Sequence, residues 1–181
     1  MPLPDFHKNY FQLFDLPVAF ALDVGQLGKR YRQLQRELHP DRYAGASAHE
    51  QRLAVQYSAL VNEAYTTLRK PLSRALYLLE LGGMHREEVA SQQVDGGFLI
   101  EQMELREKLE GLAGLVDPES ALDHLVNEIH TDIAAHQAEF SQAYAAAETN
   151  RAASACVKMQ YLDKLLQEAE QIESRMIDGR D

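Results

Sequence analysis

The chain has 181 residues, 45% of them hydrophobic, and a formal net charge of −10. This length allows one large domain or two small ones, with enough apolar residues to fill a core. No apolar run approaches the roughly 18 residues of a membrane-spanning helix, residues 1–5 do not resemble a signal peptide, and a single cysteine, Cys156, excludes an internal disulfide. We therefore expect a cytoplasmic protein that does not enter a membrane.

The charge is unevenly divided along the chain. Residues 1–75 carry ten Lys/Arg and seven Asp/Glu, a net charge of +3, whereas residues 76–181 carry eight and twenty-one, a net charge of −13. This asymmetry indicates two modules with different partners. Nucleic acid is not an expected partner, because its phosphates would be repelled by the acidic half.

Most of the chain has the apolar periodicity of helices, and strand-like alternation is hard to find. A short first helix is expected over residues 5–14, before Pro17. A second helix is expected over residues 24–38, with Asp23 as its N-cap. Its apolar stripe advances in steps of three and four residues and consists of Val24, Leu27, Tyr31, Leu34 and Leu38.

The second predicted helix ends at the tripeptide His39-Pro40-Asp41. Proline cannot continue a helix and disfavours helical geometry in the residue before it. The tripeptide therefore predicts a rigid turn that holds an imidazole and a carboxylate. Three cations fall opposite the apolar stripe of this helix, which turns by about 100° per residue: Lys29, Arg32 and Arg36. A solvated face explains the cations alone, whereas cations and turn together indicate a binding surface.

A third helix is expected to begin at a capping box formed by Ser47 and Glu50 and to continue to Arg69. Its apolar face would pack against that of the second helix. The two helices would then form an antiparallel hairpin with the 39–41 turn at one tip.

A fourth helix is expected over residues 71–81, where the glycines 82 and 83 end it. Residues 84–96 are polar, lack an apolar period and are predicted to be a linker. Three further helices are expected over residues 97–112, 118–147 and 151–177, with Asp117 capping the middle one. With short connections, these three helices form a small antiparallel bundle.

The predicted fold is therefore all-α and has two domains. Residues 1–83 contain the helical hairpin with short flanking helices, residues 84–96 link the domains, and residues 97–181 form the three-helix bundle.

The helix over residues 97–112 carries apolar residues on two faces. Its core stripe consists of Phe98, Leu105, Leu109 and Leu112. Leu99, Ile100 and Met103 point away from that stripe and are bordered by Glu104 and Glu107. Large apolar groups beside carboxylates indicate a docking site. The alternative is that they pack against the first domain or the linker.

The sequence lacks the motifs that would indicate a catalytic site or a metal site. His39 and Asp41 could form an acid–base pair, but no nucleophile or oxyanion motif accompanies them. The seven histidines show no metal-ligand spacing, and there is no glycine-rich phosphate loop. We therefore expect no enzyme activity, no metal and no cofactor, and we expect Cys156 to be a buried, inert thiol.

Several sequence motifs, spread over nearly the whole chain, are typical of one family. They are Tyr10-Phe11-x-Leu13-Phe14, Tyr31-Arg32-x-Leu34-Gln35, His39-Pro40-Asp41-Arg42, Asn62-x-Ala64-Tyr65-x-x-Leu68, Pro71-Leu72-x-Arg74-Ala75-x-Tyr77-Leu78-Leu79, Phe98-Leu99-Ile100-Glu101-Gln102-Met103-Glu104-Leu105-Arg106-Glu107 and Tyr161-Leu162-Asp163-Lys164-Leu165. With these motifs the chain resembles J-domain co-chaperones and, more closely, the HscB-type J-proteins of bacterial iron–sulfur cluster assembly.

The resemblance implies that the first domain is a J-domain, which docks on an HscA-type heat-shock ATPase and stimulates its ATP hydrolysis. The chaperone-binding residues would be His39, Pro40, Asp41, Lys29, Arg30, Arg32 and Arg36. The C-terminal bundle would bind the iron–sulfur scaffold protein IscU through Leu99, Ile100, Met103, Glu104, Glu107 and Tyr161. Tyr161 replaces an aromatic residue that often lacks a hydroxyl, and Gly111 replaces a residue that can be acidic.

Two other functions remain possible from the sequence. A general J-protein would recruit a DnaK-type chaperone to another client, and a structural helical adaptor would have no chaperone partner. The docking residues around Leu99 distinguish a scaffold-binding protein from the first alternative. The 39–41 turn with its basic helix argues against the second alternative.

Overall fold

A computed structural model describes residues 7–178 of the chain, and all regular structure within that range is helical. The predicted all-α fold is confirmed. The chain divides into two compact units, with the boundary between Leu78 and Leu79. This boundary falls inside the fourth helix, whereas the sequence suggested a boundary after residue 83.

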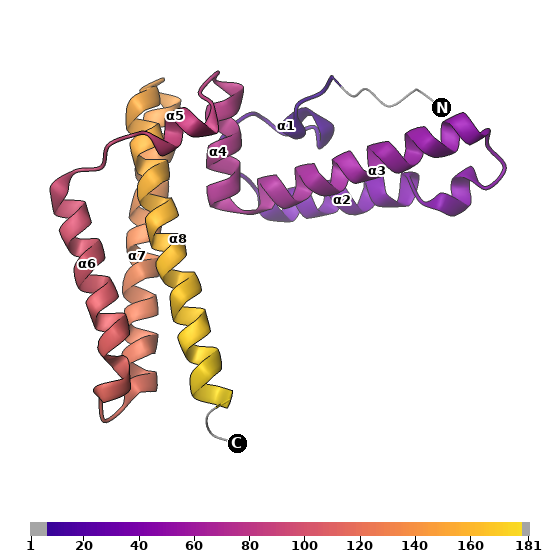
Figure 1. The fold of residues 1–181 in the computed structure, drawn as a ribbon. Coiled ribbons are helices and arrows are strands. Elements are labelled where there is room, and N and C mark those ends of the chain that lie inside the picture. Colours follow the sequence, from indigo (N-terminus) through magenta and orange to yellow (C-terminus); the bar gives the residue numbers. More distant parts are fainter. Residues whose placement is uncertain (1–6, 179–181) are drawn as a thin grey trace. The chain divides into compact units, whose positions relative to one another are not determined.

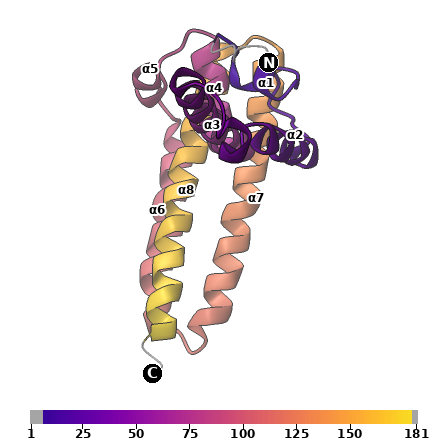
Figure 2. The same ribbon diagram turned by 90° about the vertical axis from the view of Figure 1, so that its right-hand side faces the viewer.

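The first unit is built around a helical hairpin (Figure 1). The second and third helices lie side by side in Figures 1 and 2 and are antiparallel, as predicted. A short 3-10 helix, η1 (Pro40–Tyr43), follows α2 (Val24–Glu37) and contains the proline and aspartate of the predicted turn. The bounds of the elements are α1 Tyr10–Leu13, α2 Val24–Glu37, η1 Pro40–Tyr43, α3 Ala48–Arg69 and α4 Pro71–Leu81.

Side-chain caps fix where these helices begin. The Asp23 carboxylate accepts the backbone N–H of Gln26 at 2.9 Å, which satisfies a free donor in the first turn of α2. Ser47 and Glu50 form the predicted capping box at the start of α3.

Two details of the first unit differ from the sequence prediction. The first helix is shorter than residues 5–14, because Asn9 is extended and caps a helix that starts at Tyr10. Asp5, the predicted start, lies outside the described residues. Val24 is exposed rather than part of the buried stripe, because it lies in the first turn of α2, before the buried Leu27.

A buried arginine, Arg74, connects separate segments of the first unit by hydrogen bonds to their backbone carbonyls. The Nε atom of Arg74 donates to the carbonyl of Phe20 at 2.9 Å, and its Nη1 atom donates to the carbonyl of Leu68 at 2.5 Å. The guanidinium also lies 4.9 Å from the centre of the Phe20 ring. Burial lowers the pKa of Arg74, but these acceptors offset the loss of water around the charge.

The second unit contains the predicted antiparallel three-helix bundle. Its helices are α6 (Gly96–Gly111), α7 (Pro118–Ala145) and α8 (Thr149–Asp178). They surround a core that includes Phe98, Leu109, Ile129 and Leu162. Asp95 caps α6 and Asp117 caps α7, which confirms the predicted cap of the middle helix. The bounds are α5 Arg86–Ala90, α6 Gly96–Gly111, the 3-10 helix η2 Leu112–Gly114, α7 Pro118–Ala145 and α8 Thr149–Asp178.

Residues 84–96, predicted as a linker, instead contain the helix α5. Its Val89 is buried, and α5 packs against α8. The Glu88 carboxylate accepts the N–H of His85 at 2.7 Å and so caps this short helix. Val89 is the one large apolar residue in this five-residue helix and gives no detectable period, so the sequence pattern could not indicate the helix.

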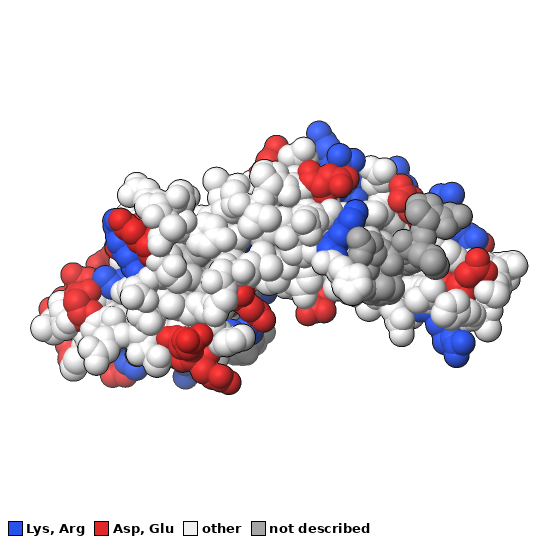
Figure 3. Space-filling model, turned by 90° about the horizontal axis from the view of Figure 1, so that it is seen from above, with Lys and Arg blue, Asp and Glu red and all other residues white. Residues whose placement is uncertain are grey.

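Across residues 7–178, the helices are too short or too polar to cross a membrane. Figure 3 shows that basic and acidic side chains are interspersed over the face seen from above. The distribution of charge in this view therefore does not mark a single binding surface.

Candidate functional site

The 39–41 turn presents its carboxylate to solvent. The Asp41 side chain is 90% exposed. The Nδ1 atom of His39 accepts the backbone N–H of Asp41 at 3.3 Å, which makes His39 the cap of η1. The same Nδ1 lies 3.4 Å from the Asp41 carboxylate. The turn therefore presents a carboxylate to solvent, where a partner's arginine could donate to it.

The predicted cations of α2 lie on its solvent face. Lys29, Arg32 and Arg36 are all exposed. Arg30 is half-buried, and its Nη2 atom lies 3.8 Å from the Asp15 carboxylate, so part of its charge is balanced within the unit. The three exposed cations are thus better placed than Arg30 to attract an acidic partner.

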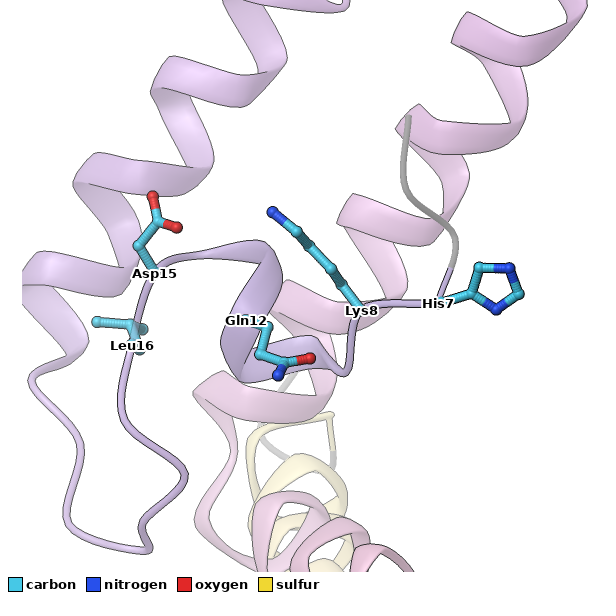
Figure 4. A pocket seen from close by; sticks show the side chains of 5 residues that line it. All are labelled: His7, Lys8, Gln12, Asp15 and Leu16. Carbon is cyan, nitrogen blue, oxygen red and sulfur yellow. The ribbon is translucent and has the colours of Figure 1, made fainter. Parts of the chain in front are cut away.

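Asp15 also borders a shallow hollow in the first unit (Figure 4). The Lys8 side chain extends on the same side of the hollow as Asp15, whereas the His7 ring points away. The φ angle of Asp15 is +52°, which is uncommon for a residue with a side chain. Because the His7 ring lies away from the Asp15 carboxylate, these two residues do not form an acid–base pair in the hollow.

A second hollow, which the sequence pattern did not predict, lies beside the 39–41 turn. Its volume is about 510 Å³, and it lies between η1 and α3. Pro40 and Tyr43 line one side, and Ala54, Val55 and Ala59 line the other. Val55 is exposed although it is apolar, and it is not one of the buried residues of α3, which are Ala54, Val61, Ala64 and Leu68. An apolar residue outside the period of that buried face was the available signal in the sequence.

The predicted docking face of α6 is exposed and apolar. We call Leu99, Ile100, Met103 and Tyr161 the apolar patch. A large part of each residue is accessible, so the rest of the second unit, including residues 84–96, does not cover the patch. The core stripe of α6 is buried as predicted, at Phe98, Leu105, Leu109 and, in η2, Leu112.

The flanking carboxylates of the apolar patch, Glu104 and Glu107, are also exposed. The Tyr161 ring, on α8, meets the buried Phe98 ring edge-on, with their centres 6.1 Å apart. The Lys164 Nζ atom lies 5.7 Å from the centre of the Tyr161 ring. The contact with Phe98 therefore joins the exposed Tyr161 ring of α8 to the start of α6, where Leu99 and Ile100 follow, and charged side chains of both signs lie nearby.

Gly111 lies at the other end of α6. It lines a hollow of about 440 Å³ together with Leu112, Leu115 and Leu125. Leu115 is exposed in the connection to α7. Gly111 offers no charge at this edge, so the acidic border of α6 does not extend to this residue.

Candidate metal ligands do not converge in the described range, residues 7–178, where no three histidine, cysteine or carboxylate side chains form a group that could hold an ion. Cys156 is buried, and burial raises the pKa of its thiol to about 12. A thiol with that pKa is protonated and unreactive near neutral pH.

The chain is similar to known co-chaperones over nearly its whole length. The family model described as the HscB C-terminal oligomerisation domain matches residues 94–170. A co-chaperone protein HscB homolog from Aeromonas hydrophila is 44% identical over 171 residues, which are 94% of this chain and 99% of that protein.

Two solved structures share this fold. Chaperone HscB from Vibrio cholerae is 39% identical, with a TM-score of 0.83, and the match covers 93% of this chain and 99% of that one. The human co-chaperone protein HscB is 34% identical, with a TM-score of 0.84 and coverage of 94% and 84%. With this identity over nearly complete chains, the protein belongs to the HscB family of co-chaperones.

Proposed function

We propose that this chain stimulates the ATPase of an HscA-type heat-shock chaperone in the cytoplasm and delivers an IscU-type iron–sulfur scaffold protein to it. The chain itself performs no chemical step. It changes which state of the ATPase is populated by binding that state more tightly.

The exposed carboxylate of Asp41 is the observation that carries the ATPase part of the proposal. It stands at the end of α2, whose solvent face carries Lys29, Arg32 and Arg36. The cations would steer the unit towards an acidic surface and raise the association rate. Asp41 would then accept a charge-assisted hydrogen bond from an arginine of the ATPase.

The apolar patch supports the scaffold part of the proposal. A partner can bury the exposed apolar side chains of the patch and can donate hydrogen bonds to the carboxylates of Glu104 and Glu107 at its border. Interfaces of this kind draw most of their binding energy from a few buried anchors inside a polar rim. When one chain holds both partners, the effective concentration of the scaffold at the chaperone rises.

A steady-state ATPase assay tests the first part. We expect the wild-type chain to raise ATP turnover by an HscA-type chaperone and the variant Asp41→Asn to lose this effect, with helicity and scaffold binding unchanged. Asp123→Asn, which alters an exposed carboxylate on α7, is the matched control. Full stimulation by Asp41→Asn would exclude the proposed role of the turn.

The second candidate is a general J-protein that recruits a DnaK-type chaperone to another client. It is favoured only by the features that any such protein would share, namely the 39–41 turn and the basic face of α2. A pull-down that compares IscU with unrelated client proteins separates the two. Selective capture of IscU supports the proposed function, and equal capture of all clients supports the alternative.

A further inference from the structure

The first turn of α6 is attached to α8 by a lysine that the sequence pattern does not single out. The Nζ atom of Lys158 lies 2.8 Å from the Asp95 carboxylate, and its side chain is only 17% exposed. The same ammonium lies 5.4 Å from the centre of the Phe98 ring. The other carboxylate oxygen of Asp95 accepts the N–H of Phe98 at 2.9 Å. One carboxylate thus caps α6 and joins it to α8.

This turn has little helical tendency of its own. Gly96 and Gly97 are its first two residues, and glycine loses more conformational entropy in a helix than any other residue. Phe98, the third residue, anchors the turn, because its ring is buried and meets the His136 and Tyr161 rings edge-on. Contacts with α7 and α8 therefore hold the turn in helical form.

The ion pair is present throughout the neutral pH range. The hydrogen bond from Lys158, followed by that from the Phe98 N–H, lowers the pKa of Asp95 to about 2. The carboxylate therefore keeps its charge far below neutral pH. Leu99 and Ile100, the first members of the apolar patch, directly follow this clamped turn.

We propose that Lys158 is a positioning residue for scaffold binding, an inference that rests on the proposed function. It keeps the first turn of α6 formed before the scaffold arrives, so that binding does not have to order Leu99 and Ile100. Lys158 acts through Asp95 and Phe98, since most of its own surface is covered. Lys164, which is exposed beside Tyr161, is the lysine placed to touch a partner.

Two variants of the full-length chain isolate the ion pair. Lys158→Met keeps the apolar stem and removes the charge, and Asp95→Asn keeps an N-cap and removes the charge. We expect each to weaken binding of purified IscU by roughly 3- to 10-fold, and the double variant to be no weaker than the singles. Calorimetry measures affinity, and amide hydrogen exchange over residues 97–101 should become faster. Lys108→Met, which breaks the Lys108–Glu128 pair (2.9 Å) between α6 and α7, should change neither.

A third substitution distinguishes positioning from direct contact. A Cβ atom added at Gly96 meets no other atom within 4 Å, so Gly96→Ala is sterically free and strengthens the first turn. In a Lys158→Met background it should restore both exchange protection and affinity. Restored protection without restored affinity would show that Lys158 touches the scaffold and would overturn the inference.

Two outcomes distinguish the positioning role of Lys158 from the proposed function on which it rests. Wild-type binding together with unchanged binding by Lys158→Met would overturn the positioning role alone. Failure of the wild-type chain to bind IscU would overturn the proposed function and this inference with it.

Discussion

Truncation of the apolar patch should weaken scaffold binding without changing the fold. Leu99 is 40% exposed and Met103 is 64% exposed, so these fractions of each side chain remain available for burial by a partner. Full burial of such a side chain is worth about 1.5–3 kcal/mol. Scaled by the exposed fractions, the double variant Leu99→Ala/Met103→Ala should lose about 1.5–3 kcal/mol. This corresponds to a roughly 10- to 150-fold weaker affinity.

Isothermal titration of IscU into the wild-type chain and the variant measures this difference. The control is Leu115→Ala/Val116→Ala, which removes two exposed apolar side chains at the connection between α6 and α7. The control should bind as the wild-type chain does, and helicity should be equal in all three. Equal affinity of the Leu99→Ala/Met103→Ala variant and the wild-type chain would refute the assignment of the patch.

Three further predictions concern buried or paired ionisable groups. Arg74→Met should lower the free energy of unfolding by about 2–4 kcal/mol, because two carbonyls lose a charged donor; a loss below about 0.5 kcal/mol in chemical denaturation would contradict this. At pH 8 Cys156 should not react with a thiol reagent until the chain is unfolded, because its pKa is about 12; rapid reaction of the native protein would show that the thiol is accessible. In an NMR titration the Asp95 carboxyl should have its midpoint near pH 2, and the midpoint should rise towards its ordinary value in Lys158→Met. Since the folded-state pKa of Asp95 is lowered, its contribution to stability is fully present above about pH 4 and is lost as pH falls through about 2, and an unshifted midpoint would argue against the clamp.

The features that could be predicted from the sequence are those with local chemical signals. The bounds of α4, the cap of α2 and the capping box of α3 follow from proline, aspartate, serine and glutamate at defined positions. The exposure of Leu99, Ile100 and Met103 follows from helical periodicity, because a second apolar face on a bundle helix has no core to enter.

The features that could not be predicted depend on contacts between distant residues. Val89 is buried by α8, and nothing in its polar neighbourhood indicates this. The ion pair between Asp95 and Lys158 joins residues 63 positions apart, and only the packing of α6 on α8 brings them together. The hollow beside the 39–41 turn likewise exists only once α3 lies next to η1.

The proposed function requires that one chain holds the ATPase and the scaffold at the same time. ATP turnover by the chaperone, measured with IscU and an equimolar mixture of Asp41→Asn and Leu99→Ala/Met103→Ala chains, tests it most directly. Each variant in the mixture keeps one intact surface. We predict that the mixture fails to reproduce the combined stimulation given by the wild-type chain with IscU. Full stimulation by the mixture would contradict the claim, because the two surfaces would then work on separate molecules.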